Sequence, residues 1–509
     1  MCCAHLSRRQ FLGTSSGLVA ASTLGFSAAA APPAWADDRW DPGRPFAMPA
    51  RPLRVLPVLM YRTPTPREKT SWKSWGGVQT DSAANEEVAR IAAELQRIQS
   101  QHAVPLEILP VARVKTVEEA QALASTPRDA TVVYPATGSG EMLRACIPDQ
   151  NTVIFTRHRS GPAYYWYEAL STRYLRPAAE AAAQPAPTGD RLLSVDDVVV
   201  DNLADLAWRL RALYAVANLR GARIVAVGGP MGKYAPEAPQ VARDRYGMEI
   251  LDVSYDDLAV RIQAALADAR CMRQSEQWAD AYLATPGTTL STGRNYIVNA
   301  FMLYGVFKDL MEEHGASLFT IQQCMSTIMP MSDTTACLTL SLLNDEGLGA
   351  FCESDFVIIP TGILLYYIAG KPVFQHNSTF PHAGVVTCAH CTGPRRMNGE
   401  RYEPTDLMTH YESEFGAAPK IEMPLGQELS FINPDYANPR WVGLRGSVID
   451  NPYLEICRSQ QDVRVDGAWE KLLDEVRDSH WVMAYGDYLK EAGFAARRFG
   501  VAWENISVA

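Results

Sequence analysis

Polar side chains that can bind metal ions or transfer protons occur in stretches of the chain that are otherwise apolar. Three segments share this feature: residues 349–355, 387–393 and 479–487. They contain two carboxylates, Glu353 and Asp355, and two imidazoles, His390 and His480. A protein that holds a divalent cation needs such donors at a few rigid positions. The segments are therefore candidates for a metal site or for acid/base chemistry.

Each of these residues also has an ordinary structural interpretation. Glu353 and Asp355 precede an apolar helix, and carboxylates at that position interact favourably with the helix dipole. His390 can be a hydrogen-bonded core residue, and His480 alone can be a packing or surface residue. No single residue among the four determines the function.

Two cysteines, Cys388 and Cys391, flank His390 at a spacing known from zinc sites and redox pairs. The sequence contains no second pair of this spacing, and Thr392 stands where haem attachment requires a histidine. Zinc, redox and haem functions are therefore not favoured for this pair.

The N-terminus has the pattern of an export signal. Arg8 and Arg9 precede a mildly apolar stretch at residues 18–31, and Ala34 and Ala36 provide small residues for a signal peptidase. This is the twin-arginine type of signal, which predicts a signal peptide at residues 1–36 and a periplasmic or otherwise extracytoplasmic protein. The route carries folded proteins, often with a cofactor already bound.

The composition limits the classes of partner. The chain has 509 residues, 47% of them hydrophobic, and a net charge of −10. The length predicts several domains, and the acidic balance argues against binding to nucleic acid or to anionic lipid. Residues 356–370 are too few to span a bilayer, so we expect a buried helix there and no membrane span after signal cleavage.

Strands alternate with helices in the first two thirds of the chain, which predicts parallel α/β units. In the first unit we expect strands at 53–61, 106–110, 130–134 and 151–155, with a helix at 86–101. The proline- and alanine-rich stretch 177–189 is typical of a linker. In the second unit we expect helices at 200–220, 255–267, 299–313 and 338–343, with strands at 223–228 and 248–253.

Short β runs dominate after residue 371. We expect strands at 385–389, 421–423, 429–432, 441–448 and 454–458, and a final helix at 488–499. The predicted fold class is α/β, with two Rossmann-like (doubly wound) α/β domains at 51–190 and 191–370 and a β-rich C-terminal domain at 371–509.

The strand expected at 223–228 runs into the turn Gly228-Gly229-Pro230-Met231-Gly232. The turn lacks the spacing of a phosphate-binding loop, and Pro230 has no backbone N–H to offer. We favour a sharp turn at the edge of a sugar site over a phosphate cradle.

Several stretches resemble the L-fucose isomerase and L-arabinose isomerase-like sugar isomerases, and most closely the fucose isomerase-like branch. The similar stretches, in order, are residues 337–347, 352–355, 370–374, 389–394, 457–460 and 480–487. The similarity extends over most of residues 190–509 and is weaker over 51–190.

The resemblance implies an oligomeric enzyme that interconverts an aldose and a ketose through an enediol, on an open-chain sugar, with a divalent ion that is typically Mn²⁺. Glu353 then matches a metal-binding carboxylate that also acts as acid/base, and His390 and His480 match histidine ligands. Asp355 assists catalysis. We expect Asn377, Arg395 and Trp481 to contact the substrate.

One position departs from the family pattern. A second carboxylate is expected shortly after Phe374, but the sequence has Gln375-His376-Asn377 there. Asn377 can coordinate a metal through its carbonyl but cannot exchange a proton near neutral pH. Asp355, His376 or Asp487 would have to supply the missing acid/base group.

Three functions follow from these observations. The leading hypothesis is an exported, metal-dependent aldose–ketose isomerase. The second is another metal-assisted proton abstraction, an epimerisation or elimination on a keto-sugar. The third is a periplasmic sugar-binding module without catalytic activity.

Overall fold

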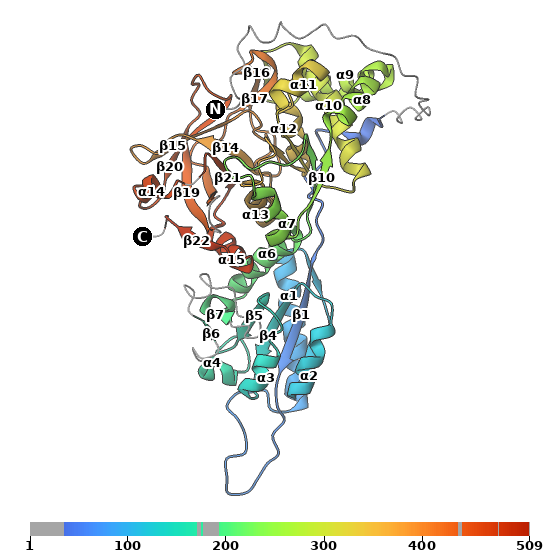
Figure 1. The fold of residues 1–509 in the computed structure, drawn as a ribbon. Coiled ribbons are helices and arrows are strands. Elements are labelled where there is room, and N and C mark those ends of the chain that lie inside the picture. The colour runs from blue at the N-terminus through green and yellow to red at the C-terminus, as the bar shows by residue number, and fades with distance from the viewer. Residues whose placement is uncertain (1–34, 171–174, 177–192, 436–439, 477, 508–509) are drawn as a thin grey trace.

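The computed structural model describes residues 35–170, 175–176, 193–435, 440–476 and 478–507 (Figure 1). The arginines and the apolar stretch of the predicted signal, and the predicted linker 177–189, lie outside the described residues. The fold is mixed α/β, with parallel sheets followed by an antiparallel β-barrel. In Figure 1 the first sheet lies at one end of the molecule and the barrel lies towards the other, with α6 (Leu203–Leu219) and α13 (Ile359–Ala369) between them.

The first sheet is parallel and has the strand order β2-β1-β4-β5-β8, with β3 also paired to β1. Its central strand, β4, is buried along its whole length, as expected for a strand covered on both faces. Its elements are β1 (Leu53–Met60), α1 (Asp81–Gln101), β2 (Leu106–Ile108), β3 (Ala112–Val114), α2 (Val117–Ala122), β4 (Ala130–Pro135), α3 (Gly140–Ala145), β5 (Thr152–Thr156), α4 (Tyr165–Ala169) and β8 (Val198–Val200). The short strands β6 (Leu175–Arg176) and β7 (Leu193–Ser194) pair beside it.

The second sheet is also parallel, with the order β10-β9-β12-β13. Its strands and helices are β9 (Arg223–Val227), α7 (Ala238–Tyr246), β10 (Glu249–Val253), α8 (Tyr255–Ala267), α9 (Ala269–Leu283), α10 (Arg294–Glu313), β12 (Leu318–Ile321), α11 (Cys324–Ser332), α12 (Cys337–Glu346) and β13 (Gly349–Cys352). All four strands point the same way, so the loops after β9 and β13 lie at one edge. Side chains at that edge of a parallel sheet are well placed to bind ligands.

The C-terminal sheet closes on itself, because β18 pairs with both β21 and β19. The ring runs β18-β21-β14-β15-β20-β19, and β22 adds to β19 in parallel. Its elements are β14 (Phe374–Ser378), β15 (Val385–His390), β18 (Glu428–Asp435), β19 (Arg440–Asp450), β20 (Ser459–Val465), α14 (Lys471–Glu475), β21 (His480–Tyr485), α15 (Leu489–Arg498) and β22 (Ala502–Asn505). A small side sheet joins β11 (Thr288–Leu290) to β16 (Thr405–His410) and β17 (Phe415–Ile421).

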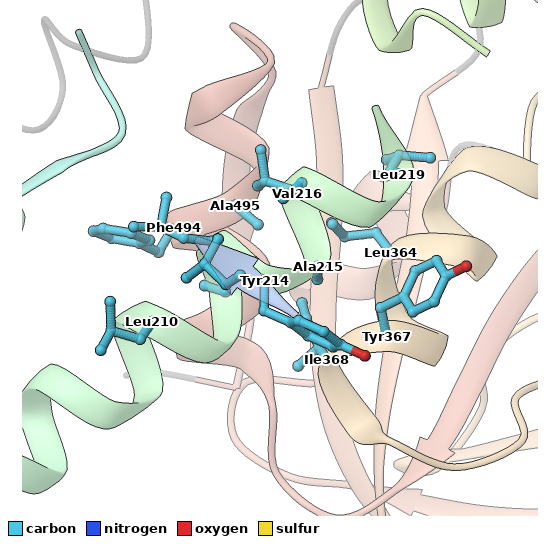
Figure 2. Close-up of a cluster of buried hydrophobic side chains, with 14 of the residues drawn as sticks. Leu210, Tyr214, Ala215, Val216, Leu219, Leu364, Tyr367, Ile368, Phe494 and Ala495 are labelled. Atoms are coloured by element: carbon cyan, nitrogen blue, oxygen red, sulfur yellow. The ribbon is translucent and has the colours of Figure 1, made fainter. Parts of the chain in front are cut away.

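Three helices, α6, α13 and α15, pack together through apolar side chains between the sheets. Figure 2 shows side chains of α6, α13 and α15 in one buried cluster, with Tyr214, Leu364 and Phe494 among them. Helix α13 is buried over nearly its whole length and ends at Gly370, whose φ of +63° suits a residue without a side chain. The expectation of a buried helix in this part of the chain is confirmed. No helix in the described ranges is both long and apolar enough to cross a bilayer.

Most predicted elements are present, with boundary shifts of a few residues. The strand predicted at 454–458 is wrong, because Asn451–Arg458 form a loop and β20 begins only at Ser459. The run predicted at 421–423 belongs mainly to the loop after β17, which ends at Ile421. Strand β21 begins with His480 itself, so this residue belongs to the barrel wall.

Trp35 belongs to the hydrophobic core formed by the second parallel sheet and its helices, although it falls within the predicted cleavage site. It is 6% exposed, stacks on Trp278 at 6.0 Å, and its indole N–H donates to Asp309. A Cβ at Gly305 would lie 2.5 Å from the Trp35 ring, so α10 accommodates this indole by having glycine there. A cut after Ala36 would remove this side chain.

We predict that Trp35→Ala lowers the free energy of unfolding by about 3 kcal/mol, because it empties a buried aromatic site. The change is measured by urea unfolding of the wild type and the variant, both uncut at Ala36, with circular dichroism as the probe. Trp75→Ala is the matched control, because Trp75 is 68% exposed. Equal stabilities of the two variants would contradict the prediction.

Candidate metal centre

Glu353, His390 and His480 come together at the junction of the second parallel sheet and the barrel. Each offers one ligand atom, and these atoms lie within 4.8 Å of one another. The Glu353 carboxylate is 4.0 Å from His390 Nε2 and 3.7 Å from His480 Nε2. The three residues proposed from the sequence as metal ligands are therefore neighbours in space.

The loop after β13 holds Glu353 in an uncommon backbone conformation. Glu353 and the next residue, Ser354, have φ values of +63° and +49°, in the left-handed region that residues with a side chain seldom occupy. The Gln375 side chain fixes the start of this loop by accepting from the N–H and donating to the C=O of Cys352. Backbone strain of this kind is typical of functional sites.

Asp355 reaches the cluster through His480. Its carboxylate accepts a hydrogen bond of 2.7 Å from His480 Nδ1, and both side chains are fully buried. The backbone N–H groups of Lys233 and Val357 also donate to this carboxylate. With Nδ1 as the donor, His480 presents the lone pair of Nε2 towards Glu353. A carboxylate in this position orients a metal-binding histidine and fixes its tautomer.

The donor atoms fit a cation. Nε2 of His390 and Nε2 of His480 are both buried, and neither has a hydrogen-bond partner within the described parts of the chain. Burial lowers the pKa of His390 to about 3, so its ring is neutral and its lone pair is available at pH 7. Two imidazoles and one carboxylate suit Mn²⁺, Fe²⁺ or Zn²⁺.

Lys233 is a neighbour of Glu353 that the sequence analysis missed. Its ammonium lies 3.6 Å from the Glu353 carboxylate and its side chain is 11% exposed. It follows the Gly228–Gly232 turn, and Met231 in that turn pairs with the loop carrying Glu353. The sequence did offer a signal for Lys233, because we expected the turn just before it to lie at the edge of the site.

Asp478 is the other neighbour that was missed. It is 3% exposed, and burial raises its pKa to about 6, with the Asp355 carboxylate as the next cause. This residue precedes His480 by two positions in the chain, and no sequence pattern distinguished it.

A cavity of about 240 Å³ opens beside the cluster. Glu353 and His390 line it together with Gln323 and a group of sulfur-containing side chains. Its volume is below the ~300–1,000 Å³ of sites for drug-sized ligands, so it suits a small molecule.

The three residues expected to contact substrate do not line this cavity. Asn377 pairs with His480 across strands β14 and β21. Trp481 faces the barrel core, opposite to His480, because side chains alternate along a strand. The Arg395 guanidinium lies between the rings of Tyr282 and Tyr402 and donates to Glu403 O.

The remaining sequence candidates differ in their position. Asp487 pairs with Arg445 at the surface, outside the Glu353 cluster. His376 is buried beside Phe431 and Trp481, and burial lowers its pKa to about 3, with electrostatic contributions from His390 and His480.

Cys388 and Cys391 do not act as a pair. Cys388 belongs to the barrel core with Phe374 and Trp481, whereas Cys391 packs with Cys337 and Ala418. Both are free thiols.

We predict that Asp355→Asn weakens Mn²⁺ binding by about 10- to 100-fold, because His480 loses the acceptor that orients it. Titration calorimetry of the metal-free protein measures the affinity. Asp487→Asn, the control, removes a carboxylate outside the cluster, and we expect it to leave the affinity for Mn²⁺ unchanged. If the two variants bind Mn²⁺ equally well, Asp355 does not orient a metal ligand.

Comparison with known proteins gives no independent assignment of this centre. A scan against protein-family models found no match to the chain, and a search of curated proteins found none either. We therefore base the functional assignment on the geometry of the site and on the motifs in the sequence.

Proposed function

We propose that the protein is a metal-dependent isomerase that interconverts an aldose and a ketose through an enediol on an open-chain sugar. The observation that carries the proposal is the convergence of Glu353, His390 and His480 at the edge of a small cavity. Following the resemblance to the L-fucose isomerase-like enzymes, we also propose that the two α/β domains are Rossmann-like (doubly wound), that the metal is Mn²⁺ and that the enzyme is a homo-oligomer. The N-terminal motif adds the proposal that the protein is exported by the twin-arginine route.

Each residue of the centre has a role in this proposal. Glu353, His390 and His480 hold the metal, and Asp355 positions His480 through the buried hydrogen bond. A divalent cation held there would supply Lewis-acid polarisation of adjacent sugar oxygens. Glu353 would take the proton from C2 of the aldose, exchange it with solvent and deliver a proton to C1 of the enediol, while the hydroxyl proton moves from O2 to O1. The product is a ketose, and no external oxidant is required.

Lys233 is our candidate for the second acid/base group, which in the family pattern is a carboxylate. Its ammonium lies 3.6 Å from the Glu353 carboxylate. An ammonium in this position can donate a proton to an oxygen of a sugar bound beside Glu353. We therefore assign the second acid/base role to Lys233 rather than to Asn377.

We predict that Glu353→Gln lowers kcat/KM for the aldose by about 100- to 10,000-fold, because the amide cannot exchange the proton. The assay incubates the purified protein with Mn²⁺ and a panel of aldoses and detects ketose by NMR. Glu86→Gln, on the exposed face of α1, is the matched control.

Elemental analysis of the same samples completes the test. The wild-type protein should contain a divalent metal, and Glu353→Gln should contain less. If Glu353→Gln changes neither metal content nor turnover, or if no aldose is converted by metal-loaded wild-type protein, the isomerase assignment is wrong.

Epimerisation or elimination on a keto-sugar is the second candidate. It is favoured by Gln375 and Asn377, which stand where the family has a second carboxylate, because these reactions can proceed from one base. Reaction in deuterated water separates the two functions. An isomerase gives a ketose with deuterium at C1, whereas an epimerase gives the epimer labelled at the inverted carbon.

A further inference from the structure

A second group of metal-binding side chains lies outside the Glu353 cluster. Cys337, Cys391 and His410 each offer one ligand atom, and these atoms lie within 4.8 Å of one another. All three residues are buried, and all three line the same cavity as Glu353. His390 and Cys391 are consecutive, so one chain segment contributes to both groups.

The fold brings these residues from distant parts of the chain. Cys337 is the first residue of α12, where the helix dipole favours a thiolate. Cys391 directly follows β15, and His410 is the last residue of β16. A register irregularity between Met408 and His410 in the pairing with β17 redirects the end of that strand.

A third cysteine, Cys457, lies beside this group. It packs against Cys337 and Cys391 and lines the same cavity, although it is not among the three donors that lie within 4.8 Å of one another. The loop that carries it is held against β16, because the Arg458 guanidinium donates to Thr409 O. This is the segment that we expected to be a strand.

Two observations indicate that a ligand belongs here. His410 is 5% exposed, yet its Nδ1 has no hydrogen-bond partner among the described residues. The three cysteines are free thiols although they lie close together. In a zinc site, S and N atoms at about 2.0–2.3 Å from the ion lie about 3.3–3.8 Å apart, so small side-chain rotations bring this group to that geometry.

We propose that Cys337, Cys391, His410 and Cys457 form a second metal site, which binds a thiophilic cation, Zn²⁺, separately from the Glu353 centre. The thiols release their protons to solvent as the ion binds, and no redox change is involved. The two sites differ in chemistry, because thiolates select zinc-like ions and a carboxylate with imidazoles accepts harder ions such as Mn²⁺. One cavity therefore holds a soft site beside a harder one.

Cobalt substitution tests the site on the full-length protein. The protein is freed of metal under reducing conditions and titrated with Co²⁺, whose thiolate complexes have charge-transfer bands in the near ultraviolet. We expect these bands in the wild type and in Glu353→Gln, and their disappearance on addition of Zn²⁺. We expect weaker bands in Cys337→Ser and Cys391→Ser, because each variant removes one thiolate ligand, and unchanged bands in Cys146→Ser, a buried cysteine elsewhere that is the matched control.

Alkylation of the wild-type protein covers the case in which a variant does not fold. Zn²⁺ should protect Cys337, Cys391 and Cys457 from a maleimide, as measured by peptide mass spectrometry, and should leave Cys146 and Cys271 unaffected.

The proposal is wrong if the wild type shows no charge-transfer bands, or if the bands keep their full intensity in both serine variants. It is also wrong if peptide analysis of the exported protein finds a disulfide between Cys337 and Cys391. These outcomes leave the isomerase assignment open, because Glu353→Gln and the aldose assay address the other donor group.

Discussion

The buried hydrogen bond between Asp355 and His480 is the contact on which the site depends. It joins the loop after β13 in the parallel sheet to the first residue of β21 in the barrel. A buried carboxylate is costly unless it is well paired, and here two backbone N–H groups share it with the imidazole. The bond therefore fixes the relative position of two sheets and the tautomer of one histidine together.

The position of Glu353 follows from the same loop. Two successive residues in the left-handed region would be unfavourable in an isolated peptide. The surrounding contacts hold them, because Gln375 binds the strand just before and Met231 pairs with the backbone just after. Glu353 thus faces His390 and His480 rather than continuing along the strand direction. The strain is consistent with a carboxylate whose position matters more than local stability.

Two donor groups of different chemistry meet at one cavity because β15 ends at its wall. His390 closes the strand and Cys391 follows it, so neighbouring residues contribute to donor groups of different chemistry. Seven of the cavity-lining residues are Cys or Met, and their weak hydrogen bonding makes the wall largely apolar. A small polar substrate would therefore be held mainly by the Glu353 centre rather than by the walls.

Local periodicity in the sequence predicted the alternation of strands and helices and the buried helix near 356–370. The choice of Glu353, His390 and His480 as metal ligands came from the resemblance to the L-fucose isomerase-like enzymes, because each residue alone also has an ordinary structural interpretation. The sequence did not show that Asp355 accepts a hydrogen bond from His480 or that Lys233 lies beside Glu353. It also did not show that Trp481 and Arg395 lie away from the cavity. It also did not group Cys337 with His410 and Cys457, which belong to separate segments. Those arrangements depend on which edges of the parallel sheet and the barrel lie against each other. Only the tertiary packing between these distant parts of the chain decides that.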